Sequence, residues 1–357
     1  MRNSDYPIDM TNRSRPLLKD VAARAEVSLT TVSMVLYGKA GSNIPPDTQA
    51  RVVAAAAELG YRPNAMARGL RRQRSDTIGV ISDEIATTPF AGAMLQGAQD
   101  AAWAAGVVLL LVNTGRDRDI EARAIEIMLD RQVDAIVYAT MSHRVVSPPA
   151  ALRDVRAVLL DARTADASLP SVVPDEVGAA RSAVETLVQH GHRRIGWVTT
   201  AEPGPATFER LAGYRSVFEE DRIAFDPSLI AVGASGDTHS GVDAAGRLLD
   251  RPDRPTALFC FNDRMAMGAY RAIRLRGLRV PQDISVVGFD NMEQIAPWLD
   301  PPLTTMQLPH YEMGRWAVDH VLREVGHDGE QESPPQRRMS CPLIERASVA
   351  APATARR

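Results

Sequence analysis

Polar side chains stand at the ends of apolar runs in the later part of the sequence. Asp161 ends VRAVLLD, Asn262 and Asp263 end TALFCFND, Asp290 ends ISVVGFD, and Arg210 is expected to open the helix after RIGWVTT. If the runs are parallel strands, their carboxyl ends meet along one edge, where open α/β sheets bind ligands. One guanidinium among carboxyl and amide oxygens there could hold a small polar molecule. The alternative is purely structural: Asn262 and Asp290 cap turns and Arg210 forms an ion pair. Asp263 is better explained as a helix N-cap than as a ligand contact.

A second group of polar residues lies near the N-terminus. Ser28, Leu29, Thr30 and Thr31 open the run TTVSMVLYG, which has the position of the second helix in a helix-turn-helix. Hydroxyl groups there can bond to phosphates or base edges, and a leucine can contact a thymine methyl group. The alternative is an ordinary helical hairpin whose polar residues are merely solvated.

The charge of the chain is distributed unevenly. Residues 13–74 hold eleven Lys and Arg against four Asp and Glu, whereas residues 75–357 carry an excess of nine negative charges. The basic part ends in a linker that could follow a phosphate backbone, with Arg62, Arg68, Arg71, Arg72 and Arg74. A basic head on an acidic body indicates nucleic-acid binding.

The elements that must carry the N-terminal group are helical. Apolar residues at helical spacing in LLKDVAARAEVSLTTVSMVLYG predict two short helices joined by a tight turn. A third helix is expected from Pro46, with Asp47 in its first turn, to a glycine stop at Gly60.

From Thr77 onward short β-rich runs alternate with longer helical stretches. The strands are TIGVI, VVLLLVNT, VDAIVYAT, VRAVLLD, RIGWVTT, LIAVGAS, TALFCFND and ISVVGFD, and the helices between them include AGAMLQGAQDAAWAAG and GAARSAVETLVQHG. Gly191 should end the second of these helices as a left-handed cap. This alternation predicts parallel α/β sheets in two halves that divide near residues 161–174.

The sequence lacks the motifs of common enzyme classes. The sequence contains no GxxxxGK[ST], GxGxxG, HExxH or GxSxG pattern, so we expect no enzyme and no cofactor. His190 and His192 flank a glycine at a helix end and suit a cap better than a metal site, and Cys260 suits a buried inert thiol. No apolar run approaches the roughly 20 residues that span a bilayer, and no signal peptide precedes the head, so we expect a cytoplasmic protein.

The sequence resembles the LacI/GalR family of bacterial transcription regulators along nearly its whole length after residue 16. The resemblance is carried, in order, by LKDVAARAEVS, TTVS, ELGYRPNAMARGL, PFAGAMLQG, GHRRIG, ERLAGY, NDRMAMGA, GLRVPQDISVVGFDN, PPLTTM and LIERASV. It implies a three-helix helix-turn-helix head and a two-lobed body that resembles periplasmic binding proteins, with parallel sheets.

The resemblance also implies a domain plan. We expect a mobile tail at 1–16, a DNA-binding domain at 17–62, a hinge helix and linker at 63–75, an effector-binding and dimerisation domain at 76–345, and a tail at 346–357. The N-lobe would comprise about 76–161 plus 291–320, and the C-lobe about 162–290 plus 321–345.

Site residues follow from the resemblance by position. The DNA contacts would be Ser28, Leu29, Thr30, Thr31, Ser33, Met34, Tyr37, Asn64, Ala67, Leu70 and Arg71, with Leu70 as a wedge in the minor groove. The effector contacts would be Pro89, Phe90, Asp161, Arg210, Asn262 and Asp290, a set that suits the vicinal hydroxyls of a carbohydrate.

Some positions depart from the family pattern. Glu26 stands where a glycine is common, and a left-handed backbone there would cost on the order of 1 kcal/mol. Met34 and Tyr37 replace residues that are often basic or amide, so the usual base contacts do not transfer to them. Ala91 and Gly236 lack aromatic rings that relatives place against the ligand.

The expected function is sequence-specific transcriptional regulation, most simply repression, controlled by a sugar or sugar derivative. A nucleobase or nucleoside effector and an activator role remain alternatives. The expected partners are a pseudo-palindromic double-stranded DNA operator, the effector and a second copy of the chain, since one head covers only a half-site. A transport binding protein would share the body but not the basic head.

Overall fold

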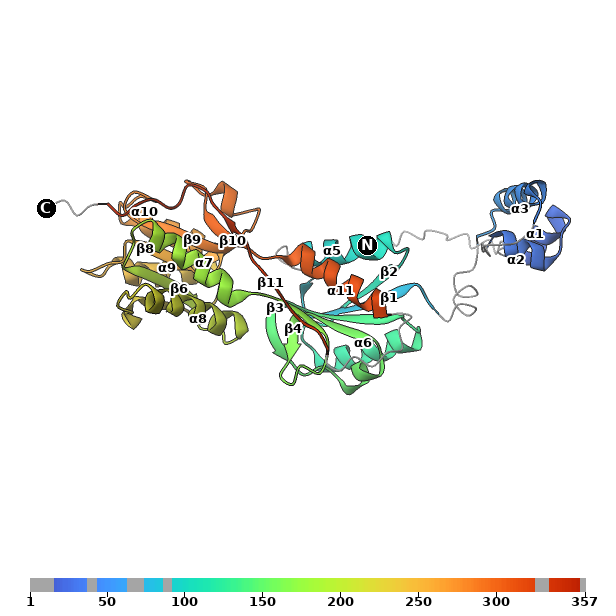
Figure 1. The fold of residues 1–357 in the computed structure, drawn as a ribbon, viewed down its shortest axis with the longest axis horizontal. Coiled ribbons are helices and arrows are strands. Elements are labelled where there is room, and N and C mark those ends of the chain that lie inside the picture. The colour runs from blue at the N-terminus through green and yellow to red at the C-terminus, as the bar shows by residue number, and fades with distance from the viewer. Residues whose placement is uncertain (1–15, 37–43, 63–73, 86–91, 325–333, 354–357) are drawn as a thin grey trace, which may run out of the picture. The chain divides into compact units, whose positions relative to one another are not determined.

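The computed structural model describes residues 16–36, 44–62, 74–85, 92–324 and 334–353 (Figure 1). The chain divides into two compact units, residues 1–75 and 76–357.

The first unit contains the three predicted helices, α1 (Leu18–Ala25), α2 (Leu29–Leu36) and α3 (Pro46–Glu58). Val21, Val32 and Val52, one from each helix, are fully buried against one another and against small alanines. A salt bridge of 2.7 Å between Arg24 and Glu58 joins α1 to α3 at the surface. Burial of one residue face per helix is what the helical spacing of apolar residues predicts.

The backbone at Glu26, in the turn between α1 and α2, is left-handed. Glu26 is the C-cap of α1 and has φ 53° and ψ 48°, the left-handed conformation. Its backbone N–H donates to the carbonyls at the end of α1, which satisfies helix acceptors despite the cost of placing a side chain there.

The second unit contains two six-stranded sheets. The first has the order β11-β5-β4-β3-β1-β2, with β1 (Thr77–Ser82), β2 (Val108–Asn113), β3 (Ala135–Val146), β4 (Ala157–Thr164), β5 (Ser171–Pro174) and β11 (Gln336–Met339). α5 (Gly92–Ala104) and α11 (His310–Glu324) cover one face and α6 (Arg118–Asp130) the other. These elements are called the N-lobe.

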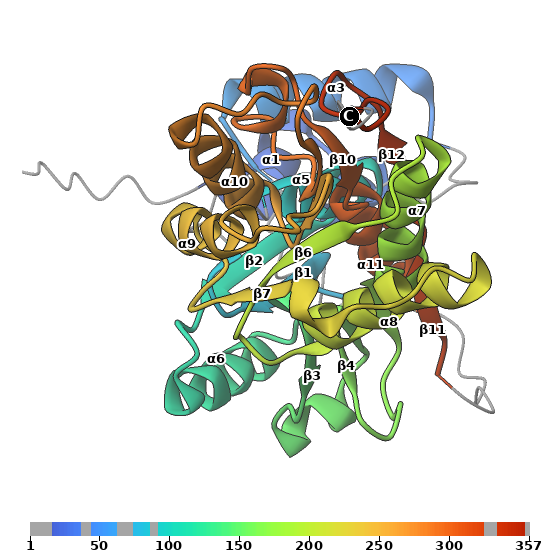
Figure 2. The same cartoon turned by 90° about the vertical axis from the view of Figure 1, so that its left-hand side faces the viewer.

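The second sheet has the order β12-β10-β9-β8-β6-β7, with β6 (Ile195–Thr200), β7 (Ile230–Gly233), β8 (Ala257–Cys260), β9 (Ser285–Asp290), β10 (Thr304–Gln307) and β12 (Leu343–Ile344). α7 (Glu176–Gln189) and α8 (Pro205–Glu220) cover one face (Figure 2). α9 (Thr238–Leu249) and α10 (Asp263–Leu275) cover the other. These elements are called the C-lobe. Only β12 runs antiparallel to its neighbour, so the predicted parallel α/β class is confirmed.

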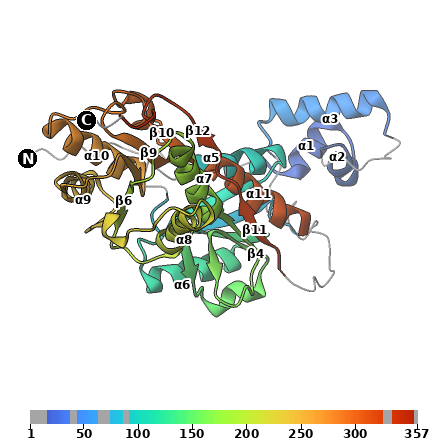
Figure 3. The same cartoon turned by 60° about the vertical axis from the view of Figure 1, so that its left-hand side comes forward.

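α5 and α11 pack closely in the N-lobe (Figure 3). A methyl group at Gly97 would lie 2.0 Å from the backbone oxygen of Tyr311, and one at Gly314 would lie 2.0 Å from that of Met94. Because each helix contributes a glycine, the two backbones touch without side chains between them.

The lobe boundaries expected from the sequence need correction. The N-lobe does not end at Asp161, because β4 continues to Thr164 and β5 follows it. β10, expected in the N-lobe, pairs with β9 in the second sheet, and β11, expected in the C-lobe, pairs with β5 in the first. The chain therefore crosses between lobes three times, after β5, after β10 and after β11. Pairing between strands far apart in sequence leaves no local pattern.

The expected tail from residue 346 is also wrong for its first residues. Ser348 is fully buried: its hydroxyl donates to the carbonyl of Val286 and accepts from the N–H of Thr304. The buried ring of His192 bonds to Thr256, Ser285 and the carbonyl of Ala350, so it anchors the C-terminal segment. Gly191 has φ +97°, as expected of a left-handed cap. None of the helices in the described residues is long and apolar enough to cross a membrane.

Candidate DNA-binding surface and effector site

The N-terminal end of α2 presents three of the eleven predicted DNA contacts to solvent. Ser28, Leu29 and Thr30 are exposed, and Leu29 keeps 51% of its surface accessible although it is a large apolar residue. The Ser28 hydroxyl accepts from the N–H of Thr31 at 3.1 Å, a local cap that begins the helix. This end of the helix therefore offers hydroxyl groups and one apolar side chain to a partner.

The remaining predicted DNA contacts differ in their placement. Met34 is exposed, one turn beyond Thr30, while Thr31 and Ser33 are half-buried. Seven predicted contacts lie outside the described residues: Tyr37, Asn64, Ala67, Leu70 and Arg71 for DNA, and Pro89 and Phe90 for the effector.

Arg210 is the centre of the predicted effector site. It lies in the second turn of α8 rather than at its start, and its side chain is 4% exposed. Its Nε donates to Glu176 at 2.6 Å and its Nη2 to the other oxygen of the same carboxylate at 3.3 Å. Nη1 donates to the carbonyl of Phe261. The guanidinium carbon also lies 3.6 Å from the ring centroid of Phe289 and 4.6 Å from that of Phe261.

These contacts fix the guanidinium plane and occupy only some of its five N–H groups. Glu176, which the sequence analysis did not single out, is the partner that matches its charge. The signal that could have found it is weak: a glutamate at the start of a helix is common for electrostatic reasons alone.

Asn262 takes the capping role that was expected for Asp263. Asn262 is the N-cap of α10, accepting from the N–H of Met265 at 2.8 Å while its amide donates to the carbonyl of Gly236 at 2.9 Å. Asp263 is not a cap: it is fully buried and accepts from the N–H of Met292 and the hydroxyl of Thr305. The cap needs an extended backbone, which Asn262 has.

Two carboxyl groups approach Arg210 from different lobes. Asp161 lies inside β4 rather than at its end, with φ 56°, and Asp290 ends β9 with φ 110°. Burial raises the pKa of Asp161, and the charge of Glu176 raises it further, while Arg210 opposes both. Burial likewise raises the pKa of Asp290, against the opposing effect of Arg210. The charge of Arg210 therefore acts to lower the pKa of both carboxyl groups.

Ion pairs join the two lobes beside this cluster. Glu209 of α8 accepts from Arg338 of β11 at 2.9 Å and lies 3.9 Å from Arg163 of β4. Asp161, Arg163 and Arg338 belong to the N-lobe, and Glu176, Arg210 and Asp290 to the C-lobe. The predicted residues Asp161, Arg210 and Asp290 are thus brought together where the lobes meet, with Asn262 next to Phe261 in the same region.

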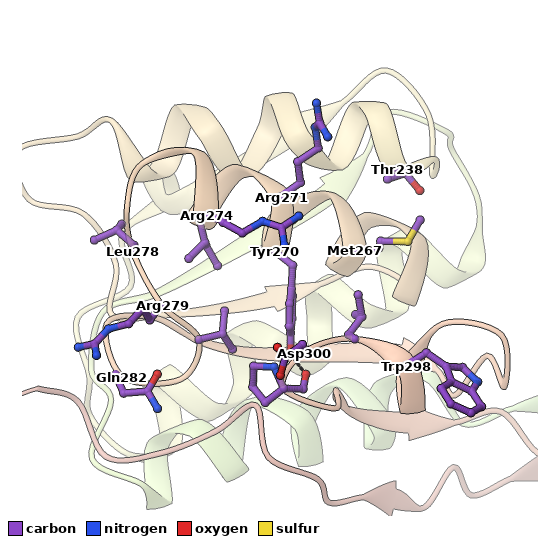
Figure 4. A pocket seen from close by; sticks show the side chains of 14 residues that line it. Thr238, Met267, Tyr270, Arg271, Arg274, Leu278, Arg279, Gln282, Trp298 and Asp300 are labelled. Carbon is purple, nitrogen blue, oxygen red and sulfur yellow. Dashed lines mark hydrogen bonds between the residues drawn. The ribbon is translucent and has the colours of Figure 1, made fainter.

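A groove of about 710 Å³ lies elsewhere on the C-lobe, beside α10 (Figure 4). Tyr270, Leu278, Val280 and Leu299 contribute its apolar wall, and the Tyr270 hydroxyl donates to the carbonyl of Pro301 at 2.9 Å. Arg271, Arg274, Arg279 and Asp300 also line it. None of the four predicted effector contacts that lie in the described residues lines this groove, so its size does not locate the effector.

The nearby indole of Trp298 is 80% exposed and Leu275 of α10 is 67% exposed. In the described residues no group of three His, Cys, Asp or Glu side chains is placed to hold a metal ion.

Two family models together match almost the whole chain. Residues 17–64 match the model described as bacterial regulatory proteins, lacI family. Residues 75–347 match the model described as periplasmic binding proteins and sugar binding domain of LacI family.

Individual relatives agree over nearly their full lengths. The chain is 34% identical to the HTH-type transcriptional repressor CytR of Escherichia coli strain K12, covering 94% of this chain and 96% of that protein. It is also 34% identical to the sucrose operon repressor of Escherichia coli, covering 93% and 99%. Among solved structures, the lac repressor dimer bound to operator and the anti-inducer ONPF matches with a TM-score of 0.77 and 28% identity, over 95% of this chain and 100% of that one.

Proposed function

The chain belongs to the lacI family of bacterial regulatory proteins, and from this premise we propose that it represses transcription by binding a pseudo-palindromic operator. The effector is a sugar or a sugar derivative that binds around Arg210. An operator-binding regulator of this kind works in the cytoplasm.

The observation that carries the proposal is the separation of two surfaces in one chain. The exposed start of α2 lies in one compact unit and the buried Arg210 cluster in the other. Ligand and DNA therefore influence each other through the arrangement of the body. A free energy of coupling of about 1–3 kcal/mol is typical of such systems, which corresponds to roughly a 5- to 150-fold change in operator affinity.

The test begins with the purified full chain and random double-stranded DNA. Selection should yield a site with two related half-sites, and a footprint should protect both. Addition of one sugar, phosphosugar, nucleoside or purine from a panel should then change the affinity within the range given above. A chain that shows no sequence preference at physiological salt, or whose operator affinity no panel member alters, would contradict the proposal.

We further propose that the working form is a homodimer and that the groove beside α10 belongs to its interface. Exposed tryptophan and leucine side chains beside an apolar wall, with arginines and an aspartate at the edge, match the composition of protein interfaces. Charges of both signs allow the same surface to meet itself across a two-fold axis.

Trp298→Asp is expected to convert the dimer to monomer at micromolar concentration. A buried tryptophan at an interface is commonly worth about 2 kcal/mol or more, or roughly thirtyfold in the dissociation constant. Sedimentation velocity measures this directly. Val232→Asp is the matched control, because Val232 is an exposed apolar residue of the edge strand β7. If both variants dissociate equally, or if neither dissociates, the groove is not part of the interface.

A further inference from the structure

His143 is buried without a hydrogen-bond partner. Its side chain belongs to β3, the residue is 3% exposed, and neither ring nitrogen meets a donor or acceptor. A buried polar group left unpaired costs about 1–3 kcal/mol, so such groups in folded proteins require an explanation. Asp161 on the neighbouring strand has an unpartnered Oδ1 as well and is 2% exposed.

An irregularity of the sheet places these two residues at adjacent positions of neighbouring strands. The pairing of β3 with β4 shifts between Ala139 and Arg144, and it resumes with Arg144 opposite Ala162. One residue earlier on each strand are His143 and Asp161. The Thr140 hydroxyl bridges the distortion, since it donates to the carbonyl of Asp161 at 2.7 Å and to that of Ser142 at 2.9 Å. Bulges of this kind redirect side chains and are common beside binding sites.

The distorted part of β3 lies next to the C-lobe. A methyl group at Gly204, the N-cap of α8, would come within 3.9 Å of the carbonyl oxygen of His143. Burial lowers the pKa of His143 to about 3, and the charges of Arg163, Arg338 and Arg210 contribute to this shift. His143 therefore lies near the start of the helix that carries Arg210 and is neutral at physiological pH.

The arginines that act on His143 and Asp161 each have a carboxylate partner. Arg210 is paired with Glu176. Arg163 and Arg338 share Glu209, and Arg144 lies 3.3 Å from Asp83. A phosphate ester carries about −1.5 to −2 charges at neutral pH. A phosphate ester bound by these arginines would compete with their carboxylate partners, which is costly for buried pairs.

We propose that His143 and Asp161 together bind the effector and that the effector is an uncharged, hydroxyl-bearing molecule rather than a phosphate ester. This inference rests on the proposed function, because it assumes that the Arg210 cluster is the effector site. A neutral imidazole offers one donor and one acceptor, and a ligand hydroxyl can satisfy either. Unpaired polar atoms in the unliganded protein thus become paired on binding.

The selectivity is tested by calorimetric titration of the full-length protein. The neutral probes are D-ribose, D-glucose, sucrose and adenosine, and their partners are ribose 5-phosphate, glucose 6-phosphate, sucrose 6-phosphate and adenosine monophosphate. At least one neutral probe should bind tenfold or more tightly than its phosphate ester. Tighter binding of an ester overturns this inference and leaves the proposed function standing. Absence of binding by all eight overturns both.

The role of His143 is tested with the neutral probe that binds best. His143→Phe should weaken binding at least tenfold, and His143→Gln, which keeps a donor and an acceptor, should weaken it less. Neither should change operator affinity without ligand. The control is His190→Phe, because His190 is exposed at the end of α7.

Thermal unfolding separates binding from a structural role. Without ligand, His143→Phe should unfold at the wild-type temperature or above it, because the change removes unpaired buried groups. Unchanged ligand affinity together with a lower unfolding temperature would show that His143 only supports the sheet, and would overturn its assignment to the site.

Discussion

Thr30→Glu is expected to abolish specific operator binding. Thr30 is exposed in the first turn of α2, beside Ser28 and Leu29. A carboxylate placed against phosphates or base acceptors meets like charge, which costs several kcal/mol at an interface. We expect a loss of about a hundredfold or more in affinity, since each 1.4 kcal/mol is worth about a factor of ten. Fluorescence anisotropy with the selected operator at fixed salt measures it.

The control variant adds the same negative charge at another position of the same compact unit. Ala54 is exposed on α3, so Ala54→Glu adds one carboxylate to the head on a different helix from α2. It should lower the affinity only through the net charge, by a modest and salt-dependent factor. Similar losses in the two variants would mean that α2 is not the surface that reads the DNA. Both variants should bind the effector as the wild type does.

Arg210→Ala is expected to destabilise the body as well as remove the effector response. The substitution leaves the Glu176 carboxylate buried without the guanidinium that balances its negative charge. Removal of one member of a buried pair costs about 3–5 kcal/mol. Urea denaturation of the full chain, followed by tryptophan fluorescence, should show this loss as a lower midpoint for the body.

A double variant separates the two effects. Glu176→Leu combined with Arg210→Met replaces the pair with apolar side chains of similar size, an exchange that is often neutral for stability. The double variant should recover most of the lost stability, still bind the operator and remain insensitive to the effector. A double variant with the full wild-type response to the effector would place the ligand site elsewhere.

Much of the fold could be predicted because its elements have strong local patterns. All eight apolar runs identified in the body are strands, from β1 at Thr77 to β9 at Ser285. The four strands that were missed, β5, β10, β11 and β12, have four residues or fewer. β11 reads QRRM and is mostly exposed, and β12 has two residues. Their place in the sheets depends on pairing with residues far away in the sequence, as does the membership of each lobe.

The candidate site could be predicted only where its residues close an apolar run or match a family motif. Asp161 and Asp290 were found because they follow apolar runs, and Arg210 because it matches a family motif. Glu176 was not found because its partner lies 34 residues away. His143 was not found because nothing in VYATMSHRVV reveals the shift in strand pairing beside it. Contacts between lobes depend on tertiary structure, which sequence periodicity does not describe.

The three crossings between the lobes have a consequence for synthesis on the ribosome. The N-lobe sheet begins at residue 77 but receives α11 and its edge strand β11 only after the C-lobe strands β6–β10 have been made. At about 5–20 residues per second, β11 follows β5 by roughly 160 residues, or roughly 10–30 s. During this time the nascent N-lobe exposes the apolar face of α5 that α11 later covers. A ribosome that stalls before residue 310 therefore holds a complete head and an unfinished N-lobe, which is a target for chaperones and proteases.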